Sequence, residues 1–174
     1  VTNIPIRYVV NTHFHYDHTD GNQVYAGKAD IIAHEYVKQA MLTLDVLHRE
    51  PYKTSQLTNV PNRIDSLKKQ IADAKDPAAR ATLETQLKVA EQGWEQLKEI
   101  KPTPPNVTYS QKKVLNLGGR EVQLLFLGRG HTNGDTVVFL PKEKVVSTGD
   151  LMESQLAYMG DAQFDEWIPT LEAL

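Results

Sequence analysis

Residues 13–18 have the sequence His-Phe-His-Tyr-Asp-His and follow directly on the apolar, β-branched run of residues 4–12. That run has no polar alternation, which is typical of a strand buried on both faces. Three histidines at the end of such a strand are costly unless they serve a purpose. Side chains two residues apart on an extended segment project to the same side, so His13 and His15 can bind one ion.

The first segment holds two more polar residues, and two further segments bring polar residues to the ends of apolar strands. Asp17 and His18 diverge from the first pair and can serve a second ion nearby. His131 stands among glycines after one apolar strand, and Asp150 ends another. Taken alone, His131 would be interpreted as a loop residue and Asp150 as a turn residue. Together with the first segment they predict a metal centre, because imidazole nitrogens and carboxylate oxygens are the ligands expected for catalytic zinc.

The bulk composition limits the partners. The chain has 174 residues, of which 40% are hydrophobic and 24% charged, and its formal net charge is −3. This predicts a globular domain of one core, with room for a large insertion, that binds neither nucleic acid nor membrane. The absence of cysteine excludes disulfides, thiolate-held zinc and cysteine nucleophiles, and it favours an exported or periplasmic setting only weakly.

The hydrophobic pattern predicts an α/β fold in which strands and helices alternate at first and hairpins follow. Helices are expected over residues 21–27, 35–48 and 164–174. Strands are expected over residues 4–12, 30–33, 112–117, 121–127, 136–140 and 144–147, with Gly118-Gly119 as a hairpin turn.

Residues 61–100 differ from the rest, because narrow apolar stripes recur at three- and four-residue steps among charged residues. Asp76-Pro77 supplies a helix cap followed by a first-turn proline, so we expect two helices in an αα-hairpin. Prolines at 102, 104 and 105 then end any helix. The hairpin is interpreted as an insertion: a plain insertion or lid near the site, or an assembly element.

Three segments together resemble the metallo-β-lactamase superfamily: HFHYDHTDGN, GRGHTNGDTVVFLP and VVSTGDL, in this order. The resemblance covers about residues 4–34 and 107–174. It implies a partial αββα sandwich, so that residues 1–174 form a single incomplete domain with the helical hairpin 61–100 inserted in it. The segments look most like general bacterial hydrolases of this superfamily, exported ones included.

The resemblance also implies a ligand set for two zinc ions. His13, His15 and His131 would hold the first ion, Asp17 and His18 the second, and Asp150 would bridge both. A zinc-bound hydroxide would then attack the substrate, with Asp17 orienting the water or accepting its proton.

Three neighbours of these ligands receive weaker assignments. The resemblance implies that Thr132 and Asp135 orient imidazoles through hydrogen bonds, and the alternative is that both shape tight glycine turns. Tyr16 either faces the substrate or packs. His34 and His48 lack a partner pattern and are expected to be ordinary surface or helix residues.

The chain departs from the family pattern at both ends. The family supplies one more histidine downstream of the bridging aspartate, whereas no histidine follows Asp150, and only twelve residues precede His13. We therefore expect the centre of the sandwich without its outer strands and last helix. The second ion should bind weakly or be absent, and exposed sheet edges should promote a homo-oligomer or another association.

These features predict a metallo-hydrolase that acts on a small molecule: an ester, thioester, lactone, lactam or phosphodiester. The carboxylate at Asp150 argues against the cysteine-bearing class of β-lactamases, and H-x-H-x-D-H differs from the H-x-E-x-D pattern of di-iron oxidoreductases. Two alternatives remain. One is a mononuclear iron oxygenase that resembles persulfide dioxygenases, and the other is an inactive fragment in which the helical hairpin drives assembly.

Overall fold

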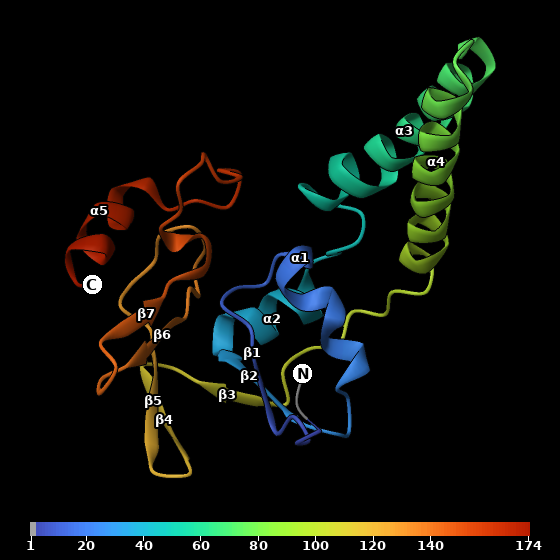
Figure 1. The fold of residues 1–174 in the computed structure, drawn as a ribbon. Helices are drawn as coiled ribbons and strands as arrows, with labels where there is room; N and C mark the ends of the chain where they lie inside the picture. Colours follow the sequence, from blue (N-terminus) through green and yellow to red (C-terminus); the bar gives the residue numbers. More distant parts are fainter. Residues whose placement is uncertain (1–2) are drawn as a thin grey trace. The chain divides into compact units, whose positions relative to one another are not determined.

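The computed structural model describes residues 3–174, which divide into two compact units. One unit combines the chain up to Val46 with Pro102–Leu174 and contains both β-sheets (Figure 1). The other unit, Leu47–Lys101, is helical where the structure assigns regular secondary structure. That the first unit forms one domain with residues 61–100 as an insertion stays a prediction.

The first sheet is parallel, with strand order β1-β2-β3. It consists of β1 (Tyr8–Val10), β2 (Asp30–His34) and β3 (Val107–Tyr109). β1 is shorter than the predicted strand 4–12, and its residues are only half-buried because it lies at the sheet edge. The expectation of burial on both faces is wrong for β1 and applies instead to the central strand β2.

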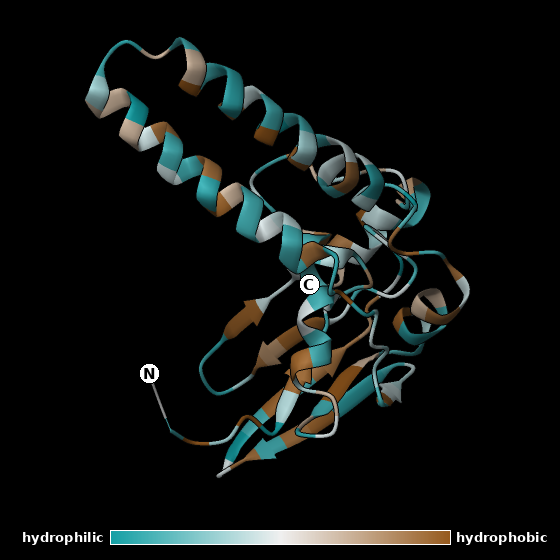
Figure 2. Ribbon diagram, turned by 90° about the vertical axis from the view of Figure 1, so that its right-hand side faces the viewer, coloured by the Kyte–Doolittle hydropathy of each residue, from teal (hydrophilic) through white to brown (hydrophobic). Residues whose placement is uncertain are grey.

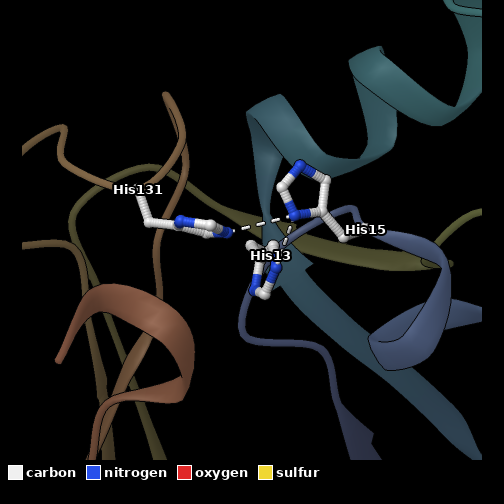
Figure 3. Close-up of side chains that lie close together, drawn as sticks. All are labelled: His13, His15 and His131. Atoms are coloured by element: carbon white, nitrogen blue, oxygen red, sulfur yellow. Dashed lines mark hydrogen bonds between the residues drawn. The ribbon is translucent and has the colours of Figure 1, made fainter. Parts of the chain in front are cut away.

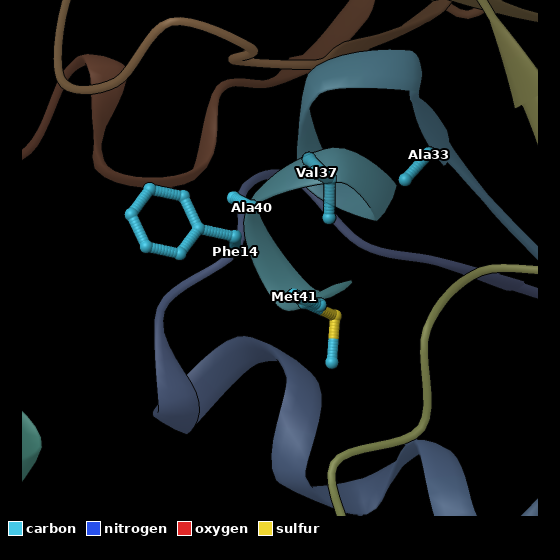
Figure 4. Packing of buried hydrophobic residues seen from close by; sticks show 5 residues of the cluster. All are labelled: Phe14, Ala33, Val37, Ala40 and Met41. Atoms are coloured by element: carbon cyan, nitrogen blue, oxygen red, sulfur yellow. The ribbon is translucent and has the colours of Figure 1, made fainter. Parts of the chain in front are cut away.

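β2 separates two hydrophobic cores. On one face, Ala33 joins a cluster with Phe14 and with Val37, Ala40 and Met41 of α2 (Glu35–Thr43) (Figure 4). On the other face, Ile32 joins a cluster that includes residues of the second sheet, such as the fully buried Leu124. The first unit therefore has a helix, the parallel sheet and a second sheet as successive layers, which fits part of an αββα sandwich.

The second sheet is antiparallel, with strand order β4-β5-β6-β7. Its strands are β4 (Lys112–Leu117), β5 (Arg120–Leu125), β6 (Val137–Leu140) and β7 (Val145–Ser147). Gly118 and Gly119 make the predicted turn, with φ angles of 59° and 86° that favour glycine. Val145 and Val146 are exposed on the edge strand β7. Association through this edge stays a prediction.

The helices of this unit differ in detail from those expected from the sequence. A helical turn, α1 (Tyr16–Thr19), and the 3-10 helix η1 (Asp20–Val24) replace the helix expected at residues 21–27. α2 ends at Thr43 rather than at residue 48, because Leu44 turns to an extended conformation. A 3-10 turn, η3 (Gly149–Leu151), follows β7, and the last helix is α5 (Phe164–Glu172).

The helical unit contains the expected hairpin. A π-helical turn, η2 (Lys53–Thr58), leads into α3 (Asn59–Asp73), and α4 is Pro77–Leu97. The Asp76 carboxylate caps α4 by accepting from the N–H groups of Ala78 and Ala79. Lys68 of α3 pairs with Glu91 of α4 at 3.0 Å. Hydrophilic residues cover most of both helices (Figure 2), and no helix within residues 3–174 has the length and apolarity to span a membrane.

His34 corrects one expectation, because it is neither a surface residue nor an ordinary helix residue. Its side chain is buried beside Phe126, with the two rings stacked at 4.2 Å between centroids. Its Nδ1 accepts from the Tyr36 N–H at the start of α2, so Nε2 carries the proton and donates to the Ser110 carbonyl at 3.0 Å. Burial lowers the pKa of His34, although the Ser110 carbonyl and Glu35 act in the opposite direction.

This pKa shift predicts an acid-labile contribution to stability. The folded state favours neutral His34, so the contribution is complete above the ordinary histidine pKa of about 6.5 and falls as the pH drops below it. Urea unfolding at pH 7.5 and 5.5 should show a smaller pH-dependent loss for His34→Gln than for the unchanged protein. His48→Gln, at an exposed position, should retain the full loss. Equal pH dependence in all three proteins would contradict the assignment.

Candidate metal centre

Three imidazoles from two distant segments converge in the first unit (Figure 3). His13 and His15 follow β1, and His131 lies in the loop between β5 and β6. His15 Nδ1 lies 3.0 Å from His13 Nε2 and 3.1 Å from His131 Nε2. All three side chains are buried, and one ring nitrogen of each lies within 4.8 Å of the others. The structure thus brings together the three residues predicted to hold the first ion.

The partners of the outer ring nitrogens favour one tautomer for two of these imidazoles. His15 Nε2 donates to the Asp161 carboxylate at 2.9 Å, so a neutral His15 presents a lone pair at Nδ1. His13 Nδ1 lies 3.1 Å from the Thr12 hydroxyl, which can accept its proton and leave a lone pair at Nε2. His131 Nδ1 has no hydrogen-bond partner within residues 3–174.

The surroundings keep two of these rings neutral. Burial holds the pKa of His13 well below its ordinary value, and the nearby His18, His15 and His131 lower it further. Burial also lowers the pKa of His131 to about 4, assisted by His15. Neutral imidazole is the form that binds metal, and inward lone pairs without protons between them repel unless a cation compensates them. The donor set therefore fits a divalent cation.

A second set of candidate ligands adjoins the first: His13, His18 and Asp150. Asp150 Oδ1 lies 3.2 Å from His18 Nε2. Its Oδ2 lies 3.8 Å from His13 Nε2 and 3.7 Å from His131 Nε2. The two oxygens of one carboxylate thus face the two groups of imidazoles, which is the arrangement that the predicted bridging role requires.

Asp17 lies at the margin of this second set. Its Oδ2 is 3.5 Å from His18 Nε2, and its side chain is 55% exposed. The hydrogen bond with His18 lowers the pKa of Asp17 although burial opposes this shift. For His18 itself, burial lowers the pKa, but Asp17, Asp150 and Glu153 together outweigh burial and raise it. The structure places Asp17 beside its predicted partner and outside both sets of close ligands.

A buried pair of amides fixes the loop that carries the first histidines. Asn11 Nδ2 donates to Asn22 Oδ1 at 3.0 Å, and Asn22 Nδ2 returns a bond to Asn11 Oδ1 at 2.9 Å. Asn11 Nδ2 also donates to the His18 carbonyl, and Asn22 Nδ2 donates to the Thr103 carbonyl. These bonds satisfy buried polar groups that would otherwise destabilise the loop. Both asparagines were missed at the sequence level, although each flanks the histidine segment.

The turn around His131 is shaped by its own side chains. Thr132 donates through N–H and hydroxyl to Asp135, with the hydroxyl bond at 2.7 Å. Gly134 N–H donates to the Thr132 hydroxyl. These are the bonds of the turn-shaping alternative, and neither Thr132 nor Asp135 hydrogen-bonds His131 Nδ1. Burial raises the pKa of Asp135 to about 6, although its bonds with Thr132 act to lower it.

Helix α5 and its N-terminal cap contact the two loops that carry His131 and Asp150. The Gln163 N–H donates to the Gly130 carbonyl at 2.8 Å, and the Thr170 hydroxyl donates to the Arg129 carbonyl at 2.7 Å. Trp167 Nε1 donates to the Leu151 carbonyl at 2.9 Å. A Cβ at position 130 would lie 2.5 Å from Leu151 Cδ1, so a larger residue there would displace the Leu151 side chain.

Asp161 is a functional candidate that the sequence did not reveal. It lies in the irregular segment before α5, where neither a strand end nor a histidine marks it. The ring of Tyr158, from the same segment, packs edge-on against His15 at 5.6 Å between centroids. Tyr16, by contrast, begins α1 in a half-buried position, and its contact with substrate stays a prediction.

Fold and site together define a metal-binding α/β protein with two adjacent ligand sets. The model of the metallo-beta-lactamase superfamily matches residues 1–174, so the chain belongs to this superfamily. Membership of the superfamily supports a metal-dependent hydrolase.

Relatives agree with this membership. Metallo-beta-lactamase IND-1 of Chryseobacterium indologenes is 36% identical over 66 residues, which are 36% of this chain and 28% of that protein. Metallo-beta-lactamase type 2 of Elizabethkingia meningoseptica is 33% identical over 64 residues, which are 34% of this chain and 26% of that protein. The structure of a metallo-beta-lactamase from Pontibacter korlensis matches 98% of this chain at 20% identity with a TM-score of 0.56. The chain spans 57% of that protein.

The contact between Asp161 and His15 predicts that the site binds a cation more weakly when the Asp161 charge is removed. Asp161→Asn keeps the shape but offers His15 a neutral acceptor, so we expect cation affinity to fall by about 10- to 100-fold. Competition with a chromophoric chelator measures this affinity. Asp165→Asn, at an exposed position on α5, removes the same charge without touching a histidine and should bind as the unchanged protein does. Equal affinity in both variants would show that Asp161 does not orient His15.

Proposed function

We propose that the chain forms the metal-binding core of a zinc-dependent hydrolase. The observation that carries this proposal is the convergence of three buried imidazole nitrogens, with no thiolate in the chain to compete. Three histidines are a usual protein ligand set for catalytic zinc, since they leave a coordination position for water or substrate. A bound divalent cation supplies Lewis-acid chemistry by polarising the substrate and lowering the pKa of a coordinated water.

The side chains of this chain then have separate tasks. His13, His15 and His131 would hold the first cation, and burial keeps two of them in the neutral form that binds it. Asp161 and Thr12 keep the outer nitrogens of His15 and His13 occupied, so that the inner nitrogens face the cation. Preset orientation of this kind reduces the cost of ordering the ligands when the cation binds.

His18, Asp150 and Asp17 would serve a second cation. The Asp150 carboxylate lies between His18 and the three-histidine group, which supports a bridging role. Asp17 is more exposed than these ligands and hydrogen-bonds with His18. We therefore assign Asp17 the additional task of holding or accepting a proton during hydrolysis, since a carboxylate that reaches solvent can exchange protons with it.

The proposed substrate is a small molecule with an ester, thioester, lactone, lactam or phosphodiester bond. The lactam is supported by the curated relatives, which are named metallo-beta-lactamases. The Asp150 carboxylate supports the other substrate bonds as well, because the proposed bridging position offers oxygen ligands rather than sulfur.

Removal of metal and removal of one ligand should have the same effect. Dialysis against a chelator should abolish hydrolysis of a panel of chromogenic esters, lactones, lactams and phosphodiesters, and zinc should restore it. His131→Ala should bind at least one equivalent less of zinc by mass spectrometry of the metal, and its turnover should not exceed background. The exposed His48→Ala should keep the metal and the turnover of the unchanged protein.

Two results would overturn the proposal. The first is turnover by His131→Ala with a full complement of metal. The second is a protein that retains iron after anaerobic purification and consumes oxygen without hydrolysing any substrate of the panel, which would favour the oxygenase alternative.

A further inference from the structure

The hydroxyl of Thr12 lies between the two candidate ligand sets. Thr12 connects β1 to His13, and its Oγ1 is 3.1 Å from His13 Nδ1 and 3.3 Å from His18 Nδ1. The two rings lie close together, with centroids 4.1 Å apart and planes tilted by 46°. His13 belongs to both ligand sets and His18 to the second only. One oxygen atom therefore contacts an imidazole from each set.

Both rings turn the same nitrogen to Thr12 and the other nitrogen to the ligands. His13 Nε2 faces His15 Nδ1 at 3.0 Å, and His18 Nε2 faces Asp150 Oδ1 at 3.2 Å. A neutral imidazole that presents its Nε2 lone pair to a cation carries its proton at Nδ1. A threonine oxygen has two lone pairs, so it can accept from both Nδ1–H groups at once.

Thr12 is itself held by the other segments of the site. Its carbonyl accepts from the Thr136 N–H at 2.7 Å, at the end of the loop that carries His131. Its side chain lies against Gly149, where an added Cβ would be 2.7 Å from Thr12 Cβ and Oγ1. Gly149 has a φ of +55° and directly precedes Asp150. A backbone hydrogen bond on one side and packing against Gly149 on the other thus fix the position of Thr12.

We propose that Thr12 is a positioning residue whose hydroxyl is the shared acceptor for His13 and His18, and so sets both imidazoles for metal binding. This inference rests on the proposed function, since it assigns the cation to the Nε2 side of both rings. When a cation occupies Nε2 of both rings, each Nδ1–H needs an acceptor, and without the hydroxyl neither Nδ1–H keeps this one. Cation binding is then weaker, because the bound form has lost a hydrogen bond to each ring.

Two substitutions separate the hydroxyl from the shape of the side chain. Thr12→Val keeps the branched shape against Gly149 and removes the hydroxyl, whereas Thr12→Ser keeps the hydroxyl and removes the methyl group. Proton and nitrogen-15 NMR of the histidine rings in the zinc-bound protein reports whether each Nδ1–H group is hydrogen-bonded. Zinc titration in competition with a chromophoric chelator reports the affinity. If Thr12→Val does not fold, as judged by circular dichroism, Thr12→Ala removes the same hydroxyl without adding a methyl group.

In the zinc-bound protein, we expect Thr12→Val to lose the hydrogen bond of the Nδ1–H group of both His13 and His18, while Thr12→Ser keeps both bonds. Zinc affinity should fall by about 10- to 100-fold in Thr12→Val, as for other groups that orient ligands, and recover to within a few-fold in Thr12→Ser. Recovery in the serine variant distinguishes an effect of the hydroxyl from an effect of packing.

Three outcomes would overturn the inference while the proposed function stands. They are unchanged Nδ1–H signals and affinity in Thr12→Val, a change confined to one of the two rings, and equal losses in Thr12→Val and Thr12→Ser. A different outcome, in which the unchanged protein binds no zinc, would defeat the proposed function and this inference with it.

Discussion

The mutual approach of three imidazole nitrogens is the constraint on which the site depends. His13, His15 and His131 face one another at about hydrogen-bond distance in a buried place, and burial lowers the pKa of His13 and His131. Protonation, which would ordinarily relieve such an arrangement in water, is therefore disfavoured. The surrounding bonds hold the three rings in place, and a divalent cation would take the inward lone pairs of all three.

Much of this centre could be predicted because it rests on local patterns. An apolar strand followed by closely spaced histidines fixes which side chains leave the strand end together, and His131 and Asp150 follow the same rule in other strands. The prediction failed where tertiary contacts decide. Asp161 meets His15 only because the segment before α5 folds back onto it, and Asn11 finds Asn22 only once the loop between them is formed.

The fold shows the same division. The hairpin at Gly118-Gly119 and the two long helices between residues 59 and 97 follow from turn chemistry and helical periodicity, and both occur as predicted. β1 was predicted to be longer and more buried, because an apolar run does not reveal whether a strand is central or at the edge. His34 was missed because its role depends on Ser110 and Phe126, which are distant in sequence.

The docking of α5 has a thermodynamic consequence. This helix and its cap donate hydrogen bonds to the backbone carbonyls of Arg129, Gly130 and Leu151. These carbonyls lie next to His131 and Asp150, so the helix fixes the loops that carry both residues. If the docked helix favours the geometry in which a cation binds, then the bound cation must favour the docked helix by an equal free energy, because such linkage is reciprocal. The C-terminal helix and the metal centre then form one cooperative unit, although no side chain of α5 is among the proposed ligands.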